Sequence, residues 1–418
     1  MPKDAILDYA FETTSPSIIK VVGVGGGGGN AVTHMYKQGI HDVSFALCNT
    51  DRQALLKSSV PSKLQLGPGL GSGNRPDIAR EIAEKDIEEI RQLLDDGTKM
   101  VFITAGMGGG TGTGAAPVIA KAAHELDILT IGIVTIPFAF EGRRKILKAL
   151  GGVEEMAKYV DALLVVNNER LREIYSDLTA PNAFAKADDT LTIAAKGIAE
   201  IITLPGDINL DFADVNTTLK EGGVAIMSTG YGEGENRVAK AFENALNSPL
   251  LNNNDVFKSK KLLFNIYYGD NELMTYEFDE VDNFTEQFDE NIVDVIWGMG
   301  KEAGLGNQVK ITLLASGFDF SNLPGQISGR GKDDKEPHGG KDPGSKDEQE
   351  KIGKYYIRSS EPVILTVEQM DDDELIAEME AVPSFLRNAK TSAKSMLQSK
   401  KANQAPPKKE DDGIIRFS

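Results

Sequence analysis

The chain has 418 residues, 40% of them hydrophobic, with a net charge of −18 at pH 7 and a single cysteine, Cys48. This length predicts about two domains, and the negative charge argues against a general binder of nucleic acid or membrane surfaces. One cysteine excludes an intrachain disulfide, and since no apolar run reaches the roughly 18 residues of a membrane span, we expect a cytoplasmic protein without direct membrane insertion.

The first element expected after a loose tail at residues 1–17 is a buried parallel strand, Ile18–Val24, rich in β-branched residues. It runs into the glycine-rich stretch Gly25–Val32, which then becomes a helix ending near Gly39. Glycines before a helix leave backbone N–H groups open to an anion and let it approach closely. The segment thus predicts a strand, a glycine loop and a helix.

The same segment also fits a dinucleotide-binding fingerprint. Asp51 follows about twenty residues after the glycines, behind a strand-like run at Val43–Leu47, and the glycines that match the spacing are Gly23, Gly25 and Gly28. An NAD(P)-dependent oxidoreductase is therefore an alternative, although one glycine fingerprint alone is weak evidence.

Next along the chain, Leu64–Gly67 leads into a Gly/Pro-rich loop through Gly71, Ser72 and Gly73. A single helix is expected from Pro76 to about Asp95, because proline suits the first helical position and an apolar stripe follows on one face.

The most unusual stretch is Ala105–Pro117, which is dominated by glycine. It lies between an apolar run, Met100–Thr104, and helical spacing at Pro117–Leu126, so a second strand feeds a second glycine loop that opens a helix. Two such loops would meet at one edge of a parallel sheet and form a nucleotide phosphate cradle. No Lys-Ser/Thr pair follows the glycines, which excludes the usual P-loop. A flexible linker is the alternative interpretation.

Another strand is expected at Leu129–Ile136, and an amphipathic helix begins within Phe138–Lys145. Glu141 stands beside a basic cluster, Arg143, Arg144 and Lys145. Such a carboxylate could hold ribose hydroxyls while the bases screen phosphate charge, or it could simply be a helix-start acid with exposed bases. Ala162–Val166 supplies the next strand.

A long helical pattern runs from about Ala183 to Leu204. The acidic turn that follows contains Asp211 and Asp214. By itself, this turn is most simply a helix N-cap with a second acid in the first helical turn.

Beyond Val215 the pattern predicts a second α/β domain in which nothing looks catalytic. It has a helix at Glu235–Leu246, and its expected strands are Gly222–Ser228, Lys261–Tyr268, Asn291–Trp297 and Gln308–Ser316.

From about Asp319 the composition shifts to Gly, Pro, Lys, Asp and Ser, which predicts a disordered linker with one β-prone run at Tyr355–Val367. Further on, Val382–Arg387 carries a Phe-Leu pair with flanking charge that suits groove binding. The basic stretch Asn388–Ser418 is expected to bind anionic lipid, another partner or nothing.

Five motifs together resemble the FtsZ family of bacterial tubulin-like cell-division GTPases. The resemblance covers about residues 18–318, and its motifs are Gly25–Ala31, Asn49–Asp51, Gly108–Gly114, Phe140–Gly142 and Asn209–Val215. It implies an α/β fold in which a parallel-sheet, Rossmann-like GTPase domain is joined by a long central helix to a second α/β domain.

The resemblance also implies boundaries along the chain. They are a flexible tail at 1–17, a GTP-binding domain at 18–182, a central helix at 183–204, a second domain for assembly and activation at 205–318, a disordered linker at 319–372, a partner-binding peptide at 373–390 and a basic extension at 391–418.

GTP or GDP is the implied ligand, with Mg²⁺ carried in by the nucleotide because the scattered histidines and the one cysteine offer no metal-ligand spacing. By the resemblance Glu141 contacts the ribose, Asp188 contacts the base and Phe184 packs against guanine. Many family members have arginine where this chain has Lys145. The resemblance therefore leaves open which basic side chain of this chain contacts the nucleotide. The implied nucleotide-binding residues are Gly26, Gly27, Gly28, Gly29, Asn30, Asn49, Asp51, Gly71, Ser72, Gly73, Gly108, Gly109, Gly110, Thr111, Gly112, Thr113, Glu141, Arg144, Lys145, Asn168, Phe184 and Asp188.

Asp211 and Asp214 are the implied catalytic residues. In the family, such acids lie at the bottom of one subunit and complete the site on the glycine-loop face of the next, where they polarise the attacking water. The resemblance therefore implies hydrolysis that needs assembly, in head-to-tail filaments that form a ring at the midcell division site and recruit other division proteins. A nucleotide-binding scaffold without turnover is a further alternative.

The C-terminal peptide is implied to dock on membrane-tether and regulatory division proteins, and no nucleic acid is an expected partner. The implied contact residues are Val382, Pro383, Phe385, Leu386 and Arg387. A chance match of a short segment is the alternative.

Overall fold

The computed structural model describes residues 17–40, 42–175, 179–247, 256–288 and 294–318, together with Ile352. The expectations for residues 1–16, for the linker apart from Ile352, for the partner-binding peptide and for the basic extension lie outside these ranges. Within the described ranges, none of the helices is long and apolar enough to cross a membrane.

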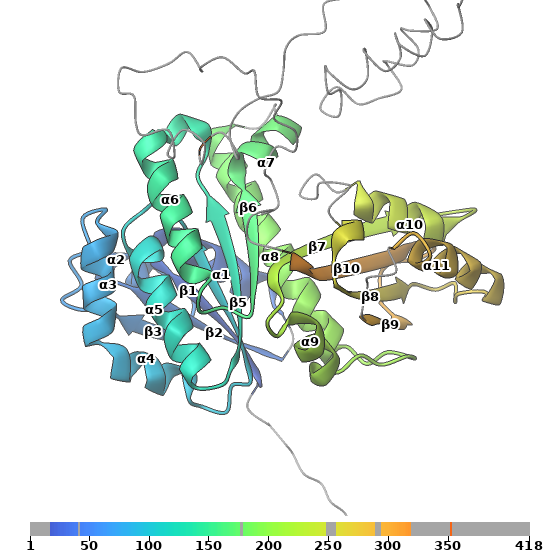
Figure 1. The fold of residues 1–418 in the computed structure, drawn as a ribbon, viewed down its shortest axis with the longest axis horizontal. Helices are drawn as coiled ribbons and strands as arrows, with labels where there is room; N and C mark the ends of the chain where they lie inside the picture. Colours follow the sequence, from blue (N-terminus) through green and yellow to red (C-terminus); the bar gives the residue numbers. More distant parts are fainter. Residues whose placement is uncertain are drawn as a thin grey trace, which may run out of the picture. The chain divides into compact units, whose positions relative to one another are not determined.

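Ten strands of the described chain form one mixed sheet (Figure 1). Their order across it is β3-β2-β1-β4-β5-β6-β7-β10-β8-β9. The strands are β1 Ile19–Val24, β2 Val43–Asn49, β3 Ser62–Gln65, β4 Met100–Gly106, β5 Leu129–Ile136, β6 Ala162–Asn167, β7 Gly223–Gly232, β8 Lys261–Tyr268, β9 Asp294–Lys301 and β10 Val309–Phe318.

The first six strands are parallel, and their order is that of a doubly wound nucleotide-binding fold. β1 pairs with β2 on one side and with β4 on the other, so that Val24 lies opposite both Cys48 and Ala105. The order of the strands reverses between β1 and β4. Both glycine-rich segments therefore leave the sheet at the switch point, where open α/β sheets bind ligands.

The two halves of the chain share this sheet. β6 and β7 join them through the parallel pairs Ala162 with Gly223 and Leu163 with Val224. Beyond that junction, β10 lies antiparallel between β7 and β8, and β9 runs parallel to β8 at the edge.

Helices cover both faces of the sheet. They are α1 Gly25–Gln38, α2 Arg52–Lys57, α3 Pro76–Lys85, α4 Ile87–Leu94, α5 Thr111–Glu125, α6 Arg143–Met156, α7 Asn168–Ile174, α8 Ala180–Thr203, α9 Phe212–Leu219, α10 Arg237–Leu246 and α11 Phe278–Thr285, with 3-10 turns at Ala139–Glu141, Val256–Lys258 and Thr275–Glu277.

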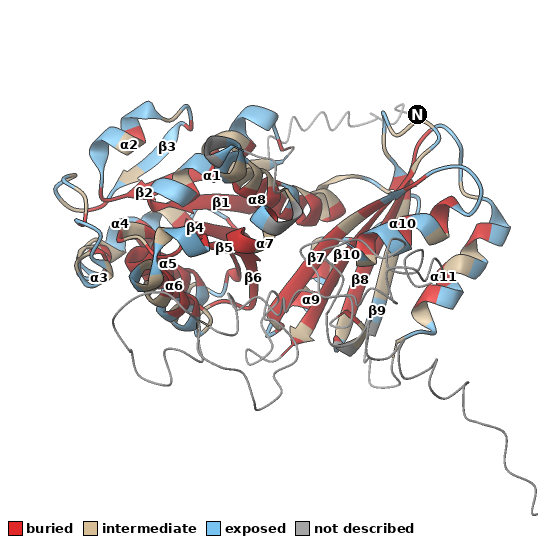
Figure 2. Ribbon diagram, turned by 90° about the horizontal axis from the view of Figure 1, so that it is seen from above, coloured by how far each residue is buried: buried red, intermediate tan, exposed pale blue. Residues whose placement is uncertain are grey.

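Alternate residues of each strand enter two hydrophobic cores on opposite faces of the sheet. In β4, Val101 and Ile103 pack in the core that includes α5, whereas Met100 and Phe102 pack in the core that includes α1 and α8. Figure 2 shows β1, β4, β5 and β6 buried along their lengths. Because both faces are covered, these strands have the continuous apolar runs from which they were predicted.

Two predicted helix starts are wrong, since both helices begin earlier. α1 begins at Gly25, so the glycine run forms its first turns, and α5 begins at Thr111, so that Pro117 lies inside it. Tertiary packing overrides the low helix propensity of glycine, and at some of these positions it leaves no room for a side chain. A Cβ on Gly28, for example, would lie 2.1 Å from the carbonyl oxygen of Thr104.

The single helix predicted from Pro76 to Asp95 is also wrong, because the chain breaks it into α3 and α4 at Asp86. There the Asp86 carboxylate accepts a hydrogen bond from the distant Gly67 N–H, at 2.6 Å. The prediction of Pro76 at the helix start is confirmed.

Agreement in the second half of the chain is closer for some elements than for others. The predicted strand Lys261–Tyr268 is confirmed as β8, whereas β9 continues past its predicted end at Trp297 to Lys301. The long helix α8 begins at Ala180, slightly before its predicted start.

Candidate nucleotide site

A cavity of 520 Å³ lies where the two glycine-rich helix starts meet at the carboxyl edge of the parallel strands. The fold brings to it side chains from the loop before α3, the 3-10 turn before α6, and α7 and α8. The predicted nucleotide-binding residues that line it are Gly26, Gly27, Asn30, Asn49, Asp51, Gly71, Ser72, Gly73, Gly109, Gly110, Thr111, Gly112, Glu141, Lys145, Asn168, Phe184 and Asp188.

The starts of α1 and α5 touch through glycine backbone. Gly25 has a φ of +72°, and a Cβ there would lie 2.7 Å from the Gly112 nitrogen. A Cβ on Gly27 would lie 3.1 Å from the Gly106 Cα. Only glycine permits this approach, and it brings the partially positive ends of two helices to one cavity. Such an arrangement favours a polyanion such as a nucleotide phosphate chain.

A threonine closes the loop before α5. The Gly108 N–H donates a hydrogen bond to Thr113 Oγ1 at 2.8 Å, which holds the loop against the first turn of the helix. The Gly108 φ of +100° is one that side chains rarely adopt, so glycine is required there. The loop is thus a fixed cradle, and the linker interpretation is wrong.

Glu141 and Lys145 form an ion pair in the wall of the cavity. The Glu141 carboxylate also accepts a hydrogen bond from the Phe138 N–H at 2.9 Å. Arg144 is exposed and does not line the cavity. Of the two basic side chains expected at the nucleotide, Arg144 and Lys145, the structure therefore places Lys145 beside the cavity.

The far end of the cavity is partly apolar and has unused acceptors. Phe184 is 43% exposed, and its ring lies edge-on to Phe138 with the centroids 5.0 Å apart. Burial, and then the neighbouring carboxylate of Asp189, raise the pKa of Asp188 to about 6. Asn168 is 5% exposed, and its Oδ1 has no hydrogen-bond partner in the described part of the chain. An unpartnered buried acceptor costs free energy, so this end suits a nucleobase with N–H groups on its edge.

Five predicted nucleotide-binding residues do not line this cavity: Gly28, Gly29, Gly108, Thr113 and Arg144. Gly28 and Gly108 serve close packing, since a Cβ on Gly108 would lie 2.8 Å from the Lys145 carbonyl oxygen. Gly29 lines a separate cavity of 300 Å³ beside α2. The motifs are thus longer than the set of residues that face the cavity.

Sequence reasoning missed several lining residues. Thr50 lies inside the motif Asn49–Asp51 but was not assigned to the site, and Thr135 lies near the carboxyl end of β5. Position at the end of a parallel strand was the signal that could have found them. The residues that line the cavity without having been predicted are Thr50, Ala54, Asn74, Gly106, Met107, Thr135, Pro137, Ala187 and Leu191.

Asp211 and Asp214 cap α9. Asp211 Oδ1 accepts hydrogen bonds from the N–H groups of Ala213, at 2.7 Å, and Asp214, at 3.1 Å. In return, Asp214 Oδ2 accepts from the Asp211 N–H at 2.9 Å. The interpretation of this turn as a helix cap is confirmed, and each carboxylate keeps one oxygen outside these bonds.

These two acids do not line the cavity of their own chain. Asp188 contacts the cavity near the start of α8, which then runs to Thr203 before the loop that reaches Asp211. That length of helix spans about 22 Å at 1.5 Å per residue. Figure 1 shows α9 beside the end of α8.

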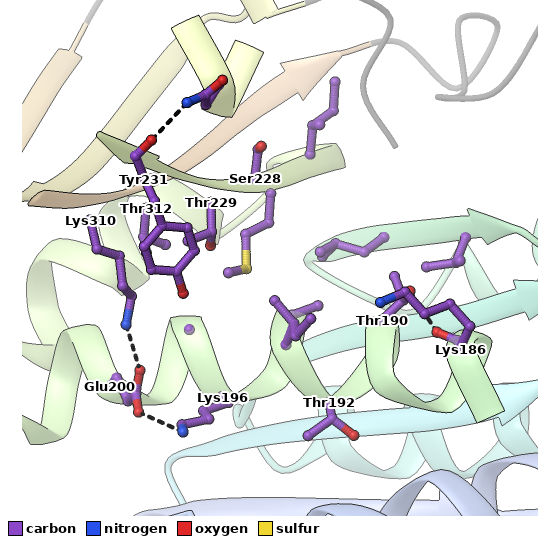
Figure 3. Close-up of a pocket in the computed structure, with 18 of the residues that line it drawn as sticks. Lys186, Thr190, Thr192, Lys196, Glu200, Ser228, Thr229, Tyr231, Lys310 and Thr312 are labelled. Atoms are coloured by element: carbon purple, nitrogen blue, oxygen red, sulfur yellow. Dashed lines mark hydrogen bonds and ion pairs between the residues drawn. The ribbon is translucent and has the colours of Figure 1, made fainter. Parts of the chain in front are cut away.

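A second cavity, of 530 Å³, lies between α8 and the sheet face formed by β7 and β10 (Figure 3). Lys310 on β10 pairs across it with Glu200 on α8, at 3.4 Å, and with Glu302, at 2.6 Å. Glu200 also pairs with Lys196, at 3.5 Å. None of the predicted nucleotide-binding residues lines this cavity, which is a joint between α8 and the second half of the sheet.

No group of three or more His, Cys, Asp and Glu side chains in the described ranges is arranged to hold a metal ion. The fold and the cavity instead define a class of protein: a doubly wound α/β nucleotide-binding protein whose phosphate cradle is made of two glycine-rich helix starts.

Comparison with known proteins identifies the family. Residues 18–176 match the GTPase domain of the Tubulin/FtsZ family, and residues 223–319 match the C-terminal domain of the FtsZ family. The cell division protein FtsZ of Porphyromonas gingivalis is 53% identical over 406 residues, which are 92% of this chain and 89% of that protein. The FtsZ of Coxiella burnetii is 41% identical over 386 residues, 91% of this chain and 98% of that protein.

Comparison with solved structures shows the same fold. An FtsZ dimer from M. jannaschii superposes with a TM-score of 0.65 at 37% identity, covering 72% of this chain and 88% of that chain. A GTPγS-bound CetZ2 protofilament from Haloferax volcanii superposes with a TM-score of 0.61 at 20% identity, covering 71% of this chain and 92% of that chain, which shows likeness of fold.

The chain belongs to the FtsZ family. It is a tubulin-like GTPase of cell division, and its ligands are GTP and GDP. The oxidoreductase alternative is therefore set aside. Asp51, the acid on which it depended, caps α2 by accepting from the N–H groups of Gln53 and Ala54.

Proposed function

We propose that GTP binds in the 520 Å³ cavity and is hydrolysed between adjacent subunits of a head-to-tail filament. The phosphates lie at the starts of α1 and α5, where Gly26, Gly27 and the segment Gly110–Gly112 present backbone N–H groups. Glu141 holds the ribose, and Lys145 offsets phosphate charge as a point charge. The convergence of two helix N-termini on one cavity supports this placement.

The other end of the cavity holds guanine in this proposal. Guanine presents N1–H and N2–H donors on one edge, and both the Asp188 carboxylate and the unpartnered Asn168 Oδ1 can accept them. The half-exposed Phe184 ring packs against the base. Mg²⁺ accompanies the nucleotide, because this cation prefers phosphate oxygens and water with only one or two carboxylates.

Catalysis by Asp211 and Asp214 requires assembly of the subunits. Their carboxylates lie at the opposite end of α8 from the cavity of their own chain, so they can only act on nucleotide bound by another copy. There the free oxygens would orient the attacking water while the glycine N–H groups hold the leaving phosphates. A contact between opposite ends of identical subunits generates a filament when its rotation does not close the subunits into a ring.

Turnover measured against protein concentration tests this function. We expect phosphate release per subunit to rise with concentration and to level off once filaments form. Asp211→Asn keeps the helix cap, since asparagine caps as well as aspartate, but removes the charge. Its turnover should fall about 100-fold with GTP affinity unchanged, in line with the loss of a water-orienting carboxylate.

Two controls sharpen this test. Asp211→Ala removes both the charge and the cap, and Glu243→Ala removes an exposed acid on α10 that lies outside the turn. Turnover that is independent of concentration, or that survives Asp211→Asn, would show that the subunits do not share the site.

We further propose that these filaments form the cytoplasmic division ring at midcell, and that residues Val382–Arg387 bind membrane tethers and regulators. The position of this apolar segment after a long polar linker supports that role. Deleting Val382–Arg387 should abolish capture of division proteins. Deleting only Asn388–Ser418 and comparing liposome and partner binding would assign the basic extension.

The domain limits given above for residues 18–182, 183–204 and 205–318 are part of this proposal. Separate expression of residues 18–182 as a cooperatively folded unit, with nucleotide affinity reduced by the loss of Phe184 and Asp188, would support the first boundary.

A further inference from the structure

Three loops meet at the hydroxyl group of Thr111, the first residue of α5. Thr50, at the end of β2, places its Oγ1 2.7 Å from Thr111 Oγ1. Ser72, in the loop before α3, places its Oγ 3.5 Å away on the weak margin of a hydrogen bond. Thr50 is fully buried and Thr111 is partly exposed to the cavity.

We propose that Thr50 is a positioning residue that aims the Thr111 hydroxyl at a nucleotide phosphate. A hydroxyl has one hydrogen to donate and two lone pairs to accept with. If the buried Thr50 donates to Thr111, the Thr111 hydrogen is left to point into the cavity. A phosphate oxygen there would receive a charge-assisted hydrogen bond from a group whose rotation is already restricted. The proposal rests on the placement of phosphates at the start of α5.

The backbone of Thr50 extends this connection to the surface. Its carbonyl oxygen accepts a hydrogen bond from the Gly71 N–H at 2.8 Å, and the neighbouring Asp51 forms a β-bridge with Leu70. Leu70 is 88% exposed and precedes Gly71, which lines the cavity. Thr50 thus contacts the phosphate loop through its side chain and the loop that presents Leu70 through its main chain.

The space around these groups leaves little freedom for other arrangements. A Cβ on Gly110 would lie 2.1 Å from Ser72 Oγ, so the loop before α3 packs directly on the backbone of the phosphate loop. Loss of the Thr50 hydroxyl should therefore release the Thr111 side chain without moving either loop.

Thr50→Val tests the proposal, because valine keeps the shape and removes the hydroxyl. We expect the Kd for GDP and the KM for GTP to rise about 5- to 10-fold. This change corresponds to the loss of about 1 to 1.5 kcal/mol of hydrogen-bond free energy. Thr50→Ser keeps the donor and should stay within about twofold of wild type. GDP binding to the full chain, measured by calorimetry, does not depend on filament formation.

Thr104→Val is the matched control. Thr104 is fully buried in β4, and its hydroxyl has no hydrogen-bond partner in the described part of the chain. Its replacement makes the same chemical change at another fully buried threonine, and we expect it to leave GDP affinity unchanged. An equal loss of affinity in Thr104→Val and Thr50→Val would mean that core packing explains the effect, which would overturn the proposal.

Thr111→Val separates this inference from the proposed phosphate placement. If Thr111→Val weakens GDP binding and Thr50→Val adds nothing in that background, both stand, because the two residues then act as one unit. If Thr111→Val weakens binding but Thr50→Val alone does not, only the positioning role fails. If Thr111→Val has no effect, the phosphate placement and the inference fail together.

Discussion

Asp188 is the residue whose charge state matters most at the base end of the cavity. Burial raises its pKa to about 6, and Asp189 adds to this through like-charge repulsion. In the nucleotide-free protein the folded state therefore takes up a proton near pH 6, well above the ordinary value of 3.8. Proton uptake favours the folded chain as the pH falls through this range, but it removes the carboxylate that accepts from guanine.

GDP affinity should consequently decrease below pH 6. From pH 7.5 to 5.5 the ionised fraction of Asp188 falls about fourfold, and the association constant should fall by the same factor. Asp188→Asn should bind more weakly at pH 7.5 and show little pH dependence. His34 on α1 and Asp189 on α8 form a pair 3.4 Å apart. Both residues are present in the wild type and in Asp188→Asn, so they do not contribute to the difference between the two proteins. Calorimetric titrations with GDP at several pH values measure this difference. If Asp188 were not responsible, the association constant would depend on pH equally in the wild type and in Asp188→Asn.

At the scale of elements, the packing of α1 on β4 makes neighbouring glycines unequal. A Cβ on Gly28 would lie 2.1 Å from a backbone oxygen of Thr104, whereas a Cβ on Gly29 would meet nothing within 4 Å. Both residues lie in the same helical turn, so their intrinsic helix preferences are alike.

Gly28→Ala should therefore lower the free energy of unfolding by about 3 kcal/mol, because backbone must move to admit the methyl group. Gly29→Ala should change it by less than about 1 kcal/mol, and in the stabilising direction. Denaturant unfolding of the nucleotide-free proteins measures both. Equal effects at the two positions would contradict the close approach of α1 to β4.

The contact between α8 and β10 depends on a buried ion cluster. The Lys310 side chain is 8% exposed. Although burial opposes its charge, the hydrogen bond that it donates to Glu302 and the charges of Glu200 and Glu302 raise its pKa overall. Its ammonium group also lies 4.8 Å from the centre of the Tyr267 ring. Figure 3 shows Lys310 and Glu200 facing each other across the second cavity.

Lys310→Met should lower the free energy of unfolding by about 3 kcal/mol, because it leaves two partly buried carboxylates without their shared cation. Lys301→Met, an exposed change at the end of β9, which β8 separates from β10, should stay within about 0.5 kcal/mol. Because Lys310 lies away from the nucleotide cavity, GDP affinity should not change in either variant. A stable Lys310→Met protein would mean that the cluster contributes no net stability.

At the scale of the whole molecule, the nucleotide cavity and the acidic turn lie at opposite ends of α8. A subunit with a damaged cavity still offers intact acids, and a subunit with damaged acids still offers an intact cavity. Subunits that share sites should complement one another, whereas subunits with independent sites cannot.

Mixing Asp211→Asn with Asp188→Ala provides this test. The first keeps its cavity and the second keeps its acids, so GTP turnover of the 1:1 mixture should exceed the mean of the two separate rates several-fold. A mixture of Asp211→Asn with Asp214→Asn damages the same face in both chains and should give no such gain. Turnover of the first mixture at the mean of the separate rates would exclude a shared site.

Patterns in the sequence predicted the strands well where burial is complete on both faces. β5 and β8 have the bounds that their apolar runs indicated, because every residue of a doubly covered strand must be apolar or hydrogen-bonded. The predicted starts of α1 and α5 were wrong because nothing in the local sequence marks them. Glycine carries no local signal for helix, and only the folded chain shows that Gly28 is required by its contact with Thr104 and Gly25 by its contact with Gly112.

The site was partly predictable. The glycine loops and Glu141 were identified because their motifs are local and their order along the chain is specific, whereas Phe184 and Asp188 were implied by the family resemblance. Thr50 and Thr135 were not, since threonine itself carries no signal and only their position at or next to the end of a parallel strand could have marked them. The same limit applied to Asp86, which ends α3 by binding a residue far away in the chain.

Local sequence was enough to establish a doubly wound nucleotide-binding fold, because strand burial and the needs of a phosphate cradle are both expressed in runs of neighbouring residues. Only the folded chain decided which glycines face the cavity and which allow close packing, and only it placed Asp211 and Asp214 at the other end of α8. Those outcomes depend on distances between segments that are remote in the sequence, and a spacing along the chain does not contain them.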